Sequence, residues 1–122
     1  MKTHKSLDVW QVAVKLAEDV YGVTRRFPKQ ELFGLTTQMR RCAISVASNI
    51  AEGAARQGDK EFVQFLYVAA GSASELDTQL EIAKRVAVGD PQELGRLQSE
   101  VERISMMLRG LIRSVRTGST RA

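Results

Sequence analysis

The residues of this chain that could do chemistry lie mostly on two segments in its middle. They are arginines, carboxylates and one asparagine, which make ion pairs and strong hydrogen bonds when partly buried: Arg40, Arg41, Asn49, Glu52, Arg56, Glu61 and Glu75. One interpretation is a hydrogen-bond and ion-pair network that fixes helix register or joins subunits. The other is a polar pocket at a subunit junction, where carboxylates and guanidinium groups would bind a small ligand. The sequence does not identify that ligand.

Conventional catalytic and metal sites are not indicated. The only histidine, His4, stands near the N-terminus, so neither a Glu-x-x-His di-iron pair nor a serine-histidine pair can be assembled. No cysteine pair, phosphate-cradling GxxxxGK loop or glycine-flanked nucleophilic serine occurs. We therefore expect no enzymatic activity, no cofactor and no metal.

A second group of candidate residues is the arginine-rich C-terminal segment. Residues 103–122 contain five arginines and no acidic residue, a local charge of +5 against +4 for the whole chain. On a helix, Arg109, Arg113 and Arg116 share one face. They could contact nucleic-acid phosphates, or they could complement the negative end of the helix dipole in solvent. No RNA-binding signature with interleaved aromatic residues accompanies them.

Four helices joined by short connections are expected to position these residues. The delimiting signals are Asp8 with Gln11, which form a capping-box pattern, then Phe27–Pro28, then Gly58–Asp59, and finally Gly89 before Asp90–Pro91 and Glu93. They place the helices at about residues 8–27, 36–57, 60–88 and 91–116, with a frayed tail over 117–122. All 122 residues then form one domain.

Periodicity in the third and fourth segments predicts how the helices pack. Apolar residues alternate spacings of four and three in both, from Phe62 to Ala87 and from Leu94 through Leu111 to Val115. Such heptad seams favour the shallow left-handed crossing of antiparallel bundles. No segment alternates with period two for long enough to make a strand. The predicted fold class is all-α, an antiparallel up-down-up-down four-helix bundle.

More apolar surface is present than four seams need. Small or apolar residues flank the seams of the second and third segments: Ile44, Ala47, Ala51, Ala55, Val63, Phe65 and Tyr67. They either lie under neighbouring helices of the same bundle or form an interface with another subunit. We expect the interface, and hence a homo-oligomer.

The chain shows no sign of export or membrane insertion. No apolar run approaches the roughly 20 residues that cross a bilayer, and no apolar stretch follows the basic N-terminus. A soluble protein of the cytoplasm, without a membrane partner, is therefore expected. The single cysteine, Cys42, falls on the apolar stripe of the second segment, so we expect a core residue rather than a reactive thiol.

Blocks of sequence over the first two thirds of the chain resemble one bacterial family. They are Val9–Trp10–Gln11, Phe27–Pro28, Phe33–Gly34–Leu35–Thr36, Ser48–Asn49–Ile50–Ala51–Glu52–Gly53, Ala70–Gly71–Ser72 and Glu75–Leu76. The family comprises small four-helix-bundle proteins encoded in intervening sequences of large-subunit ribosomal RNA genes and elsewhere in bacterial genomes. This chain departs from it at Ala47, where family members usually have proline, so its second helix should be straighter.

The resemblance implies an all-helical bundle that assembles into a ring-like homopentamer, with no established enzymatic activity. The architecture is also similar to that of accessory proteins of diversity-generating retroelements, which are basic pentameric barrels that engage nucleic acid and a reverse transcriptase; this second similarity is one of fold. We therefore expect a non-enzymatic homo-oligomeric bundle that acts as an assembly or nucleic-acid-associated accessory protein, with RNA or DNA as a partner. The alternative is a small-ligand-binding regulatory protein with a polar pocket at subunit junctions.

Overall fold

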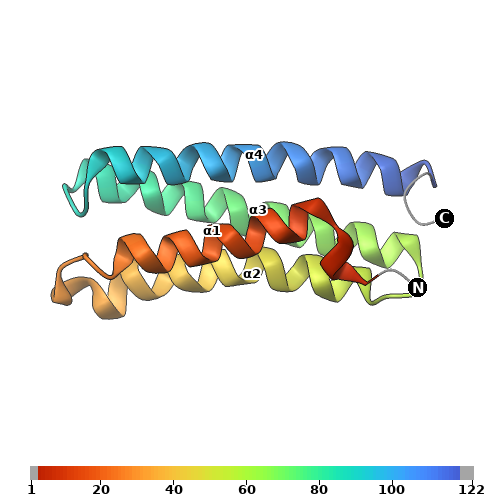
Figure 1. The fold of residues 1–122 in the computed structure, drawn as a ribbon, viewed down its shortest axis with the longest axis horizontal. Coiled ribbons are helices and arrows are strands. Elements are labelled where there is room, and N and C mark those ends of the chain that lie inside the picture. Colours follow the sequence, from red (N-terminus) through yellow and green to blue (C-terminus); the bar gives the residue numbers. More distant parts are fainter. Residues whose placement is uncertain (1–2, 119–122) are drawn as a thin grey trace.

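The computed structural model describes residues 3–118 and shows four long helices. Helix α1 spans Asp8–Thr24, α2 spans Thr37–Ala54, α3 spans Asp59–Arg85 and α4 spans Pro91–Arg116. Successive helices run in opposite directions along the long axis, and their connections alternate between its two ends (Figure 1). No strand is present among residues 3–118. The predicted all-α, up-down-up-down four-helix bundle is confirmed.

A single core runs along the axis of the bundle. Each helix contributes a stripe of buried apolar side chains, and several of them are 0% exposed: Leu16 in α1, Met39 in α2, Leu80 in α3 and Leu108 in α4. The seams predicted for the third and fourth segments are confirmed from Phe62 to Ala83 and from Leu94 to Leu108. Burial of these stripes is the main source of stability, because each large apolar side chain removed from water contributes about 1.5–3 kcal/mol.

The seam of α4 shifts by one residue near its C-terminal end. Leu111, predicted to be buried, is only half-buried, whereas Ile112 is 5% exposed. The prediction was wrong because a strict 3.5-residue repeat drifts by roughly 20° per heptad against a straight helix of 3.6 residues per turn. More than two heptads after Leu94, the core-facing residue is therefore Ile112 rather than Leu111, and Val115 is buried as predicted.

Helix α3 ends at Arg85, before the predicted end at residue 88. Ala87 has a φ of 60°, the left-handed conformation that glycine usually adopts at helix ends. The N–H of Val88 donates to the carbonyl of Ala83 at 2.8 Å, and the N–H of Ala87 donates to that of Lys84 at 3.2 Å. This pair of hydrogen bonds is the Schellman motif. Ala87, predicted to extend the seam, is exposed, and Val88 packs onto the core instead.

The predicted start of α4 is confirmed. Asp90 is its N-cap, and its Oδ1 accepts a hydrogen bond from the N–H of Gln92 at 3.0 Å. Pro91 is the first helical residue, where a missing N–H leaves no hydrogen bond unmade. Glu93, expected to complete a capping box, forms an ion pair with Arg26 instead and so ties α4 to the connection that follows α1.

The predicted N-caps of α1 and α3 are each displaced by one residue. Leu7 and Gly58 are the caps, without a side-chain hydrogen bond, and Asp8 and Asp59 lie in the first helical turns. The Gln11 side chain, assigned to a capping box with Asp8, donates at 2.9 Å to a backbone carbonyl upstream of α1. The two aspartates still complement the positive end of each helix dipole.

The connection between α1 and α2 is longer than predicted, because α1 ends at Thr24 rather than at residue 27. A short 3-10 turn, Lys29–Glu31, and a wide turn, Leu32–Thr36, precede α2. Gly34 leaves the helical region within the wide turn (φ −118°, ψ −111°), and the neighbouring Phe33 is 92% exposed. Helix α2 then runs uninterrupted through position 47 and ends at residue 54 rather than 57.

Helices α2 and α3 make the most extensive contact in the bundle. It leaves no room for a side chain at Gly53, where an added Cβ atom would lie 2.7 Å from the Cβ atom of Phe65 and 3.2 Å from the carbonyl oxygen of Phe62. Atoms cannot approach so closely, so only glycine fits here without moving α3.

Of the expected tail, Thr117 and Gly118 form a turn after α4, and residues 119–122 lie outside the described part of the chain. None of the described helices combines the length and the apolar composition needed to span a bilayer.

Replacing Ala87 with glycine should stabilise the protein by about 1 kcal/mol, because a Cβ atom is strained at positive φ and glycine has none. The measurement is the free energy of unfolding in urea. Ala70→Gly, in the interior of α3, is the matched control and should destabilise by about 1 kcal/mol. A loss of stability in both variants would contradict the left-handed conformation of Ala87.

Candidate nucleic-acid interface

Arginine side chains form an exposed row along the last turns of α4. Arg109, Arg113 and Arg116 are all exposed and occupy one face of the helix at spacings of four and three. The row extends for about 10 Å along the helix axis. Residues 103–118 contain no acidic side chain that would neutralise it. The three predicted cations therefore form one continuous positive surface, the arginine row.

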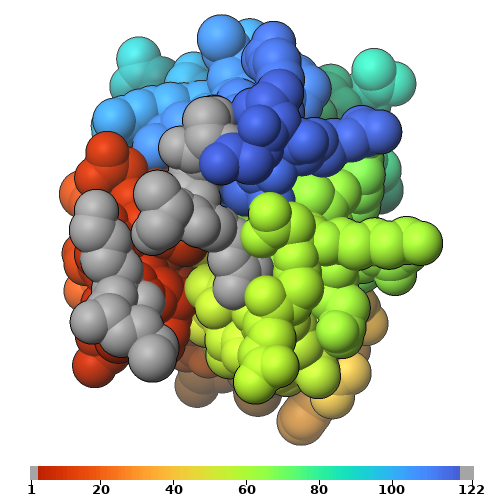
Figure 2. Space-filling model, turned by 90° about the vertical axis from the view of Figure 1, so that its right-hand side faces the viewer, coloured from red at the N-terminus to blue at the C-terminus, as the bar shows by residue number. Residues whose placement is uncertain are grey.

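The C-terminal end of the arginine row lies against α3. Arg116 donates a hydrogen bond from Nη1 to the hydroxyl of Tyr67 at 3.0 Å. Figure 2 views this end of the bundle, where the last turns of α4 (blue) and the first turns of α3 (yellow-green) lie side by side. An exposed aromatic ring is thus held beside a guanidinium group at the α3–α4 boundary.

Among the predicted polar residues, Arg40 joins α2 to α1. Its Nε donates to Oγ1 of Thr24 at 3.0 Å, and its guanidinium carbon lies 4.4 Å from the centre of the Tyr21 ring. Thr24 is 3% exposed, and its hydroxyl also donates to the carbonyl of Val20 at 2.7 Å. Arg40 therefore holds the first turns of α2 against the last turn of α1, a structural role.

Asn49 belongs to a different cluster, on the seam between α2 and α3. Its Nδ2 donates to the carbonyl of Ser45 at 2.8 Å and to the hydroxyl of Ser45 at 2.9 Å. That hydroxyl shares a 2.8 Å hydrogen bond with the hydroxyl of Ser72 on α3. The cluster cross-links the two helices. Its serines were missed as site residues, although Ser45 stands four residues before Asn49, the spacing that places two side chains on one helix face.

Glu52 and Arg56 make a third, more exposed group. Their charged atoms are 3.5 Å apart, and the guanidinium carbon of Arg56 lies 4.9 Å from the centre of the Phe65 ring. An exposed ion pair of this kind contributes little to stability. The other predicted polar residues, Arg41, Glu61 and Glu75, are exposed.

The predicted polar residues thus do not converge on one site. Two surface clefts of the described residues, one between α1 and α4 and one between α3 and α4, are lined by other side chains. Nor does the described part of the chain bring together three histidine, cysteine or carboxylate groups that could hold a metal ion. A ligand pocket built from the predicted set would need side chains of a neighbouring subunit to close it.

The residues predicted to form a subunit interface on α3 face different sides of that helix. Phe65 packs against Gly53 of α2, whereas Tyr67 contacts Arg116 of α4. Val63 is partly buried against the core. These three residues therefore do not form one continuous surface.

Most of the predicted interface residues on α2 lie on one face of that helix. Ile44 is 44% exposed, Ala51 is half-buried and Ala55 is exposed. Their spacings of seven and four place them along one outer face of α2, together with Ser48. Ala47 is partly buried against the core. The exposed face of Ile44, Ser48, Ala51 and Ala55, here called the α2 outer face, is the part of the predicted interface that remains open to a partner.

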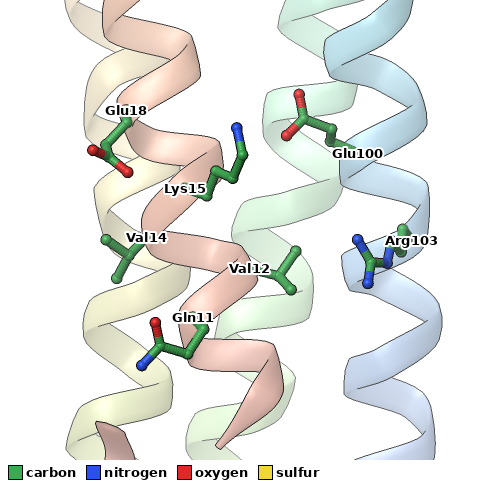
Figure 3. A pocket seen from close by; sticks show the side chains of 7 residues that line it. All are labelled: Gln11, Val12, Val14, Lys15, Glu18, Glu100 and Arg103. Atoms are coloured by element: carbon green, nitrogen blue, oxygen red, sulfur yellow. The ribbon is translucent and has the colours of Figure 1, made fainter.

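The cleft between α1 and α4 holds a carboxyl group with a shifted pKa. The cleft has a volume of about 450 Å³, and Lys15 and Glu100 lie on its opposite sides (Figure 3). Burial and the neighbouring Asp19 raise the pKa of Glu100 from 4.5 to about 7, while Lys15 and Arg96 oppose the rise. Glu100 is therefore partly protonated at neutral pH. No sequence signal marks the pairing of Glu100 with Asp19, because the two carboxyl groups come from different helices.

Cys42 is a core residue, as predicted, with 6% of its surface exposed. Burial raises the pKa of its thiol, and Glu75 adds to the rise. The Nε2 of Gln79, which donates to Sγ at 3.3 Å, acts in the opposite direction. The thiol stays protonated at neutral pH, so it packs rather than reacts.

Comparisons with known proteins agree with this fold. The sequence model of the family described as 23S rRNA-intervening sequence protein matches residues 5–110. A solved structure, of a protein with unknown function from the S23 ribosomal protein family of Bacteroides thetaiotaomicron, has a TM-score of 0.78. It is 21% identical, and the match covers 86% of this chain and 95% of that one. Such distant identity supports the fold alone. No curated protein is significantly similar to the chain.

Replacing Glu100 with glutamine should make the protein more stable above neutral pH and less sensitive to pH. Because the folded-state pKa of about 7 lies above the ordinary 4.5, Glu100 contributes stability at low pH that is lost as the pH rises through about 7. Glutamine stays neutral and can still donate to Asp19. The gain over the native protein at about pH 8 should be about 1 kcal/mol, since solvent screens a group that is not fully buried.

The measurement is urea unfolding of both proteins at several pH values. The difference in unfolding free energy should shrink as the pH falls from about 7 to below 4.5, where Glu100 becomes protonated in both states. Glu102→Gln, at an exposed position two residues further along α4, is the control. A difference that stays constant with pH would contradict the raised pKa.

Proposed function

The chain belongs to the family of 23S rRNA-intervening sequence proteins, and from this membership we propose that it is a non-enzymatic, homo-oligomeric accessory protein that binds RNA or DNA. The observation that carries the proposal is the arginine row on α4, where Arg109, Arg113 and Arg116 are exposed on one face. Guanidinium groups bind phosphate oxygens in bidentate fashion. A polyanion with regularly spaced phosphates is therefore the partner that fits this row best.

Contacts of this kind predict binding without base-sequence preference. Phosphate contacts position a protein on nucleic acid but carry no sequence information. Three arginines neutralise about three phosphates, so a single subunit would bind weakly. Several copies held in one assembly raise the effective concentration of each row after the first has bound. Oligomerisation is thus part of the binding mechanism.

A non-enzymatic role is supported by how the polar side chains are distributed. Arg40, Asn49 and Glu52 belong to separate clusters, and each has hydrogen-bond or ion-pair partners within the bundle. Catalysis requires an acid, a base or a nucleophile within hydrogen-bond reach of one reacting position. The polar clusters instead join neighbouring helices or turns, which is the work of a scaffold.

The α2 outer face is the surface we propose for assembly. Ile44 supplies an exposed apolar anchor, and Ser48, Ala51 and Ala55 are small enough for a partner helix to approach closely. When the α2 outer face of one subunit packs against a different face of the next, the head-to-tail contact closes into a ring if the rotation between subunits permits. The resemblance to the family suggests five subunits.

Changing Arg109, Arg113 and Arg116 together to glutamine should weaken binding to RNA and DNA and flatten its salt dependence. Each phosphate that is no longer neutralised reduces the slope of log affinity against log salt by roughly 0.9 for a duplex and 0.7 for a single strand. The measurement is fluorescence anisotropy with labelled oligonucleotides at several salt concentrations. Helix content should not change, because all three side chains are exposed.

The matched control removes three cations at the opposite end of the bundle, in Arg25→Gln, Lys29→Gln and Arg41→Gln, which are also exposed. It lowers the net charge equally but should leave most of the salt slope in place. Equal effects of the two triple variants would mean that net charge alone matters. If the native protein binds neither RNA nor DNA even at low salt, the proposed function is wrong.

Replacing Ala51 with glutamate should dissociate the assembly, because an unpaired carboxylate buried between subunits costs several kcal/mol. Size exclusion with light scattering should report a change from about five times the 13.5 kDa chain mass toward the mass of one chain. Ser99→Glu, which adds the same charge at an exposed position on α4, should leave the mass unchanged. A monomeric native protein would overturn the proposed assembly.

A further inference from the structure

A cleft opens beside the arginine row, at the end of the bundle shown in Figure 2. It lies between the first turns of α3 and the last turns of α4 and has a volume of about 590 Å³. Arg116 belongs to both the row and the cleft, so the two form one continuous surface. The volume falls within the range of about 300–1,000 Å³ that small organic ligands occupy.

The cleft combines an aromatic ring with apolar and cationic groups. Tyr67 is 52% exposed, and the 3.0 Å hydrogen bond from Arg116 to its hydroxyl orients the ring. Val63 and the buried Val115 also line the cleft, and Lys60 stands on the α3 side. A planar ring fixed beside two cations is the arrangement on which nucleic-acid bases stack while phosphates are neutralised.

We infer that this cleft binds one unpaired nucleotide of a single-stranded RNA or DNA, with its base against the Tyr67 ring and its phosphates between Lys60 and Arg116. The inference rests on the proposed nucleic-acid binding and adds to it a preference for single strands. In a duplex, the faces of the bases are covered by their neighbours in the stack. Only a splayed or terminal nucleotide can enter the cleft.

The other polar groups of the cleft fit this occupant. Asp59 also lines it, so the charge of the lining is two cations against one carboxylate. The net positive charge of the lining favours an anionic group such as a phosphate. Gln64 offers both a donor and an acceptor to a base edge, so no single base is selected. The preference is for strandedness rather than for sequence.

The test compares Tyr67→Ala with Val68→Ala, the adjacent residue, which has the same exposure of 52%. Labelled single-stranded and duplex oligonucleotides of equal length are titrated by fluorescence anisotropy. Tyr67→Ala should lose single-strand affinity by about tenfold, with duplex affinity and salt slope nearly unchanged, since stacking carries little salt dependence. Tyr67→Phe should retain most of the single-strand affinity, and Val68→Ala should retain all of it.

A second measurement reports the contact directly. Ultraviolet cross-linking of the native protein to a uridine-rich single strand should modify the tryptic peptide of residues 61–84, which contains Tyr67. The cross-link should disappear in Tyr67→Ala. Circular dichroism and the melting temperature of that variant establish that it is folded.

The possible failures are distinguishable. A native protein that binds no nucleic acid would refute the proposed function and this inference together. Equal affinity for single strands and duplexes, unaffected by Tyr67→Ala, would overturn the inference and leave the arginine row as the binding site. A changed oligomeric mass in Tyr67→Ala would mean that a second copy of the chain covers the cleft, which would also overturn the inference.

Discussion

The close approach of α2 to α3 is the contact on which the rest of the bundle depends. Gly53 has no room for a Cβ atom, and the buried alanines along the same two helices, Ala43, Ala69 and Ala73, are 0% exposed. Small residues let two helix axes come near enough for polar groups at the edge of the seam to meet. The hydroxyl groups of Ser45 and Ser72 do so at 2.8 Å, which fixes the helix register. Helices α1 and α4 then complete a core whose width this pair has set.

The fold could be predicted from the sequence wherever a local pattern determined the outcome. The apolar seams and the Asp90–Pro91 cap are short-range signals, and both appear as expected. Ala87 could not be predicted, because nothing in an alanine marks a left-handed conformation that tertiary packing of Val88 imposes. The shift of the α4 seam from Leu111 to Ile112 likewise comes from the straightness of the helix, which a heptad count does not contain.

In the candidate site, too, features set by local sequence could be predicted, and features set by tertiary contacts could not. The spacing of the arginine row places it on one helix face, and the absence of acidic residues nearby leaves it positively charged. Both features are visible in the sequence. The polar clusters depend instead on which helices become neighbours. Arg40 finds Thr24, and Glu100 finds Asp19, only after the chain has folded. The sequence thus indicates the surface that faces outward, whereas the predicted polar residues lie in separate clusters or are singly exposed in the folded chain.

The contact between α1 and α4 is the least extensive between neighbouring helices. It also affects when the apolar stripe of α1 is covered during synthesis of the chain. Of the four helices, α1 leaves the ribosome before the others, yet α4, one of the two helices that flank it, is synthesised after the other three. Until residues beyond 91 emerge, the stripe containing Leu16 and Val20 lacks part of its cover. Partly folded chains with uncovered apolar stripes are the species that aggregate or are held by chaperones. A nascent chain of this protein therefore passes through a vulnerable stage that lasts until α4 is complete.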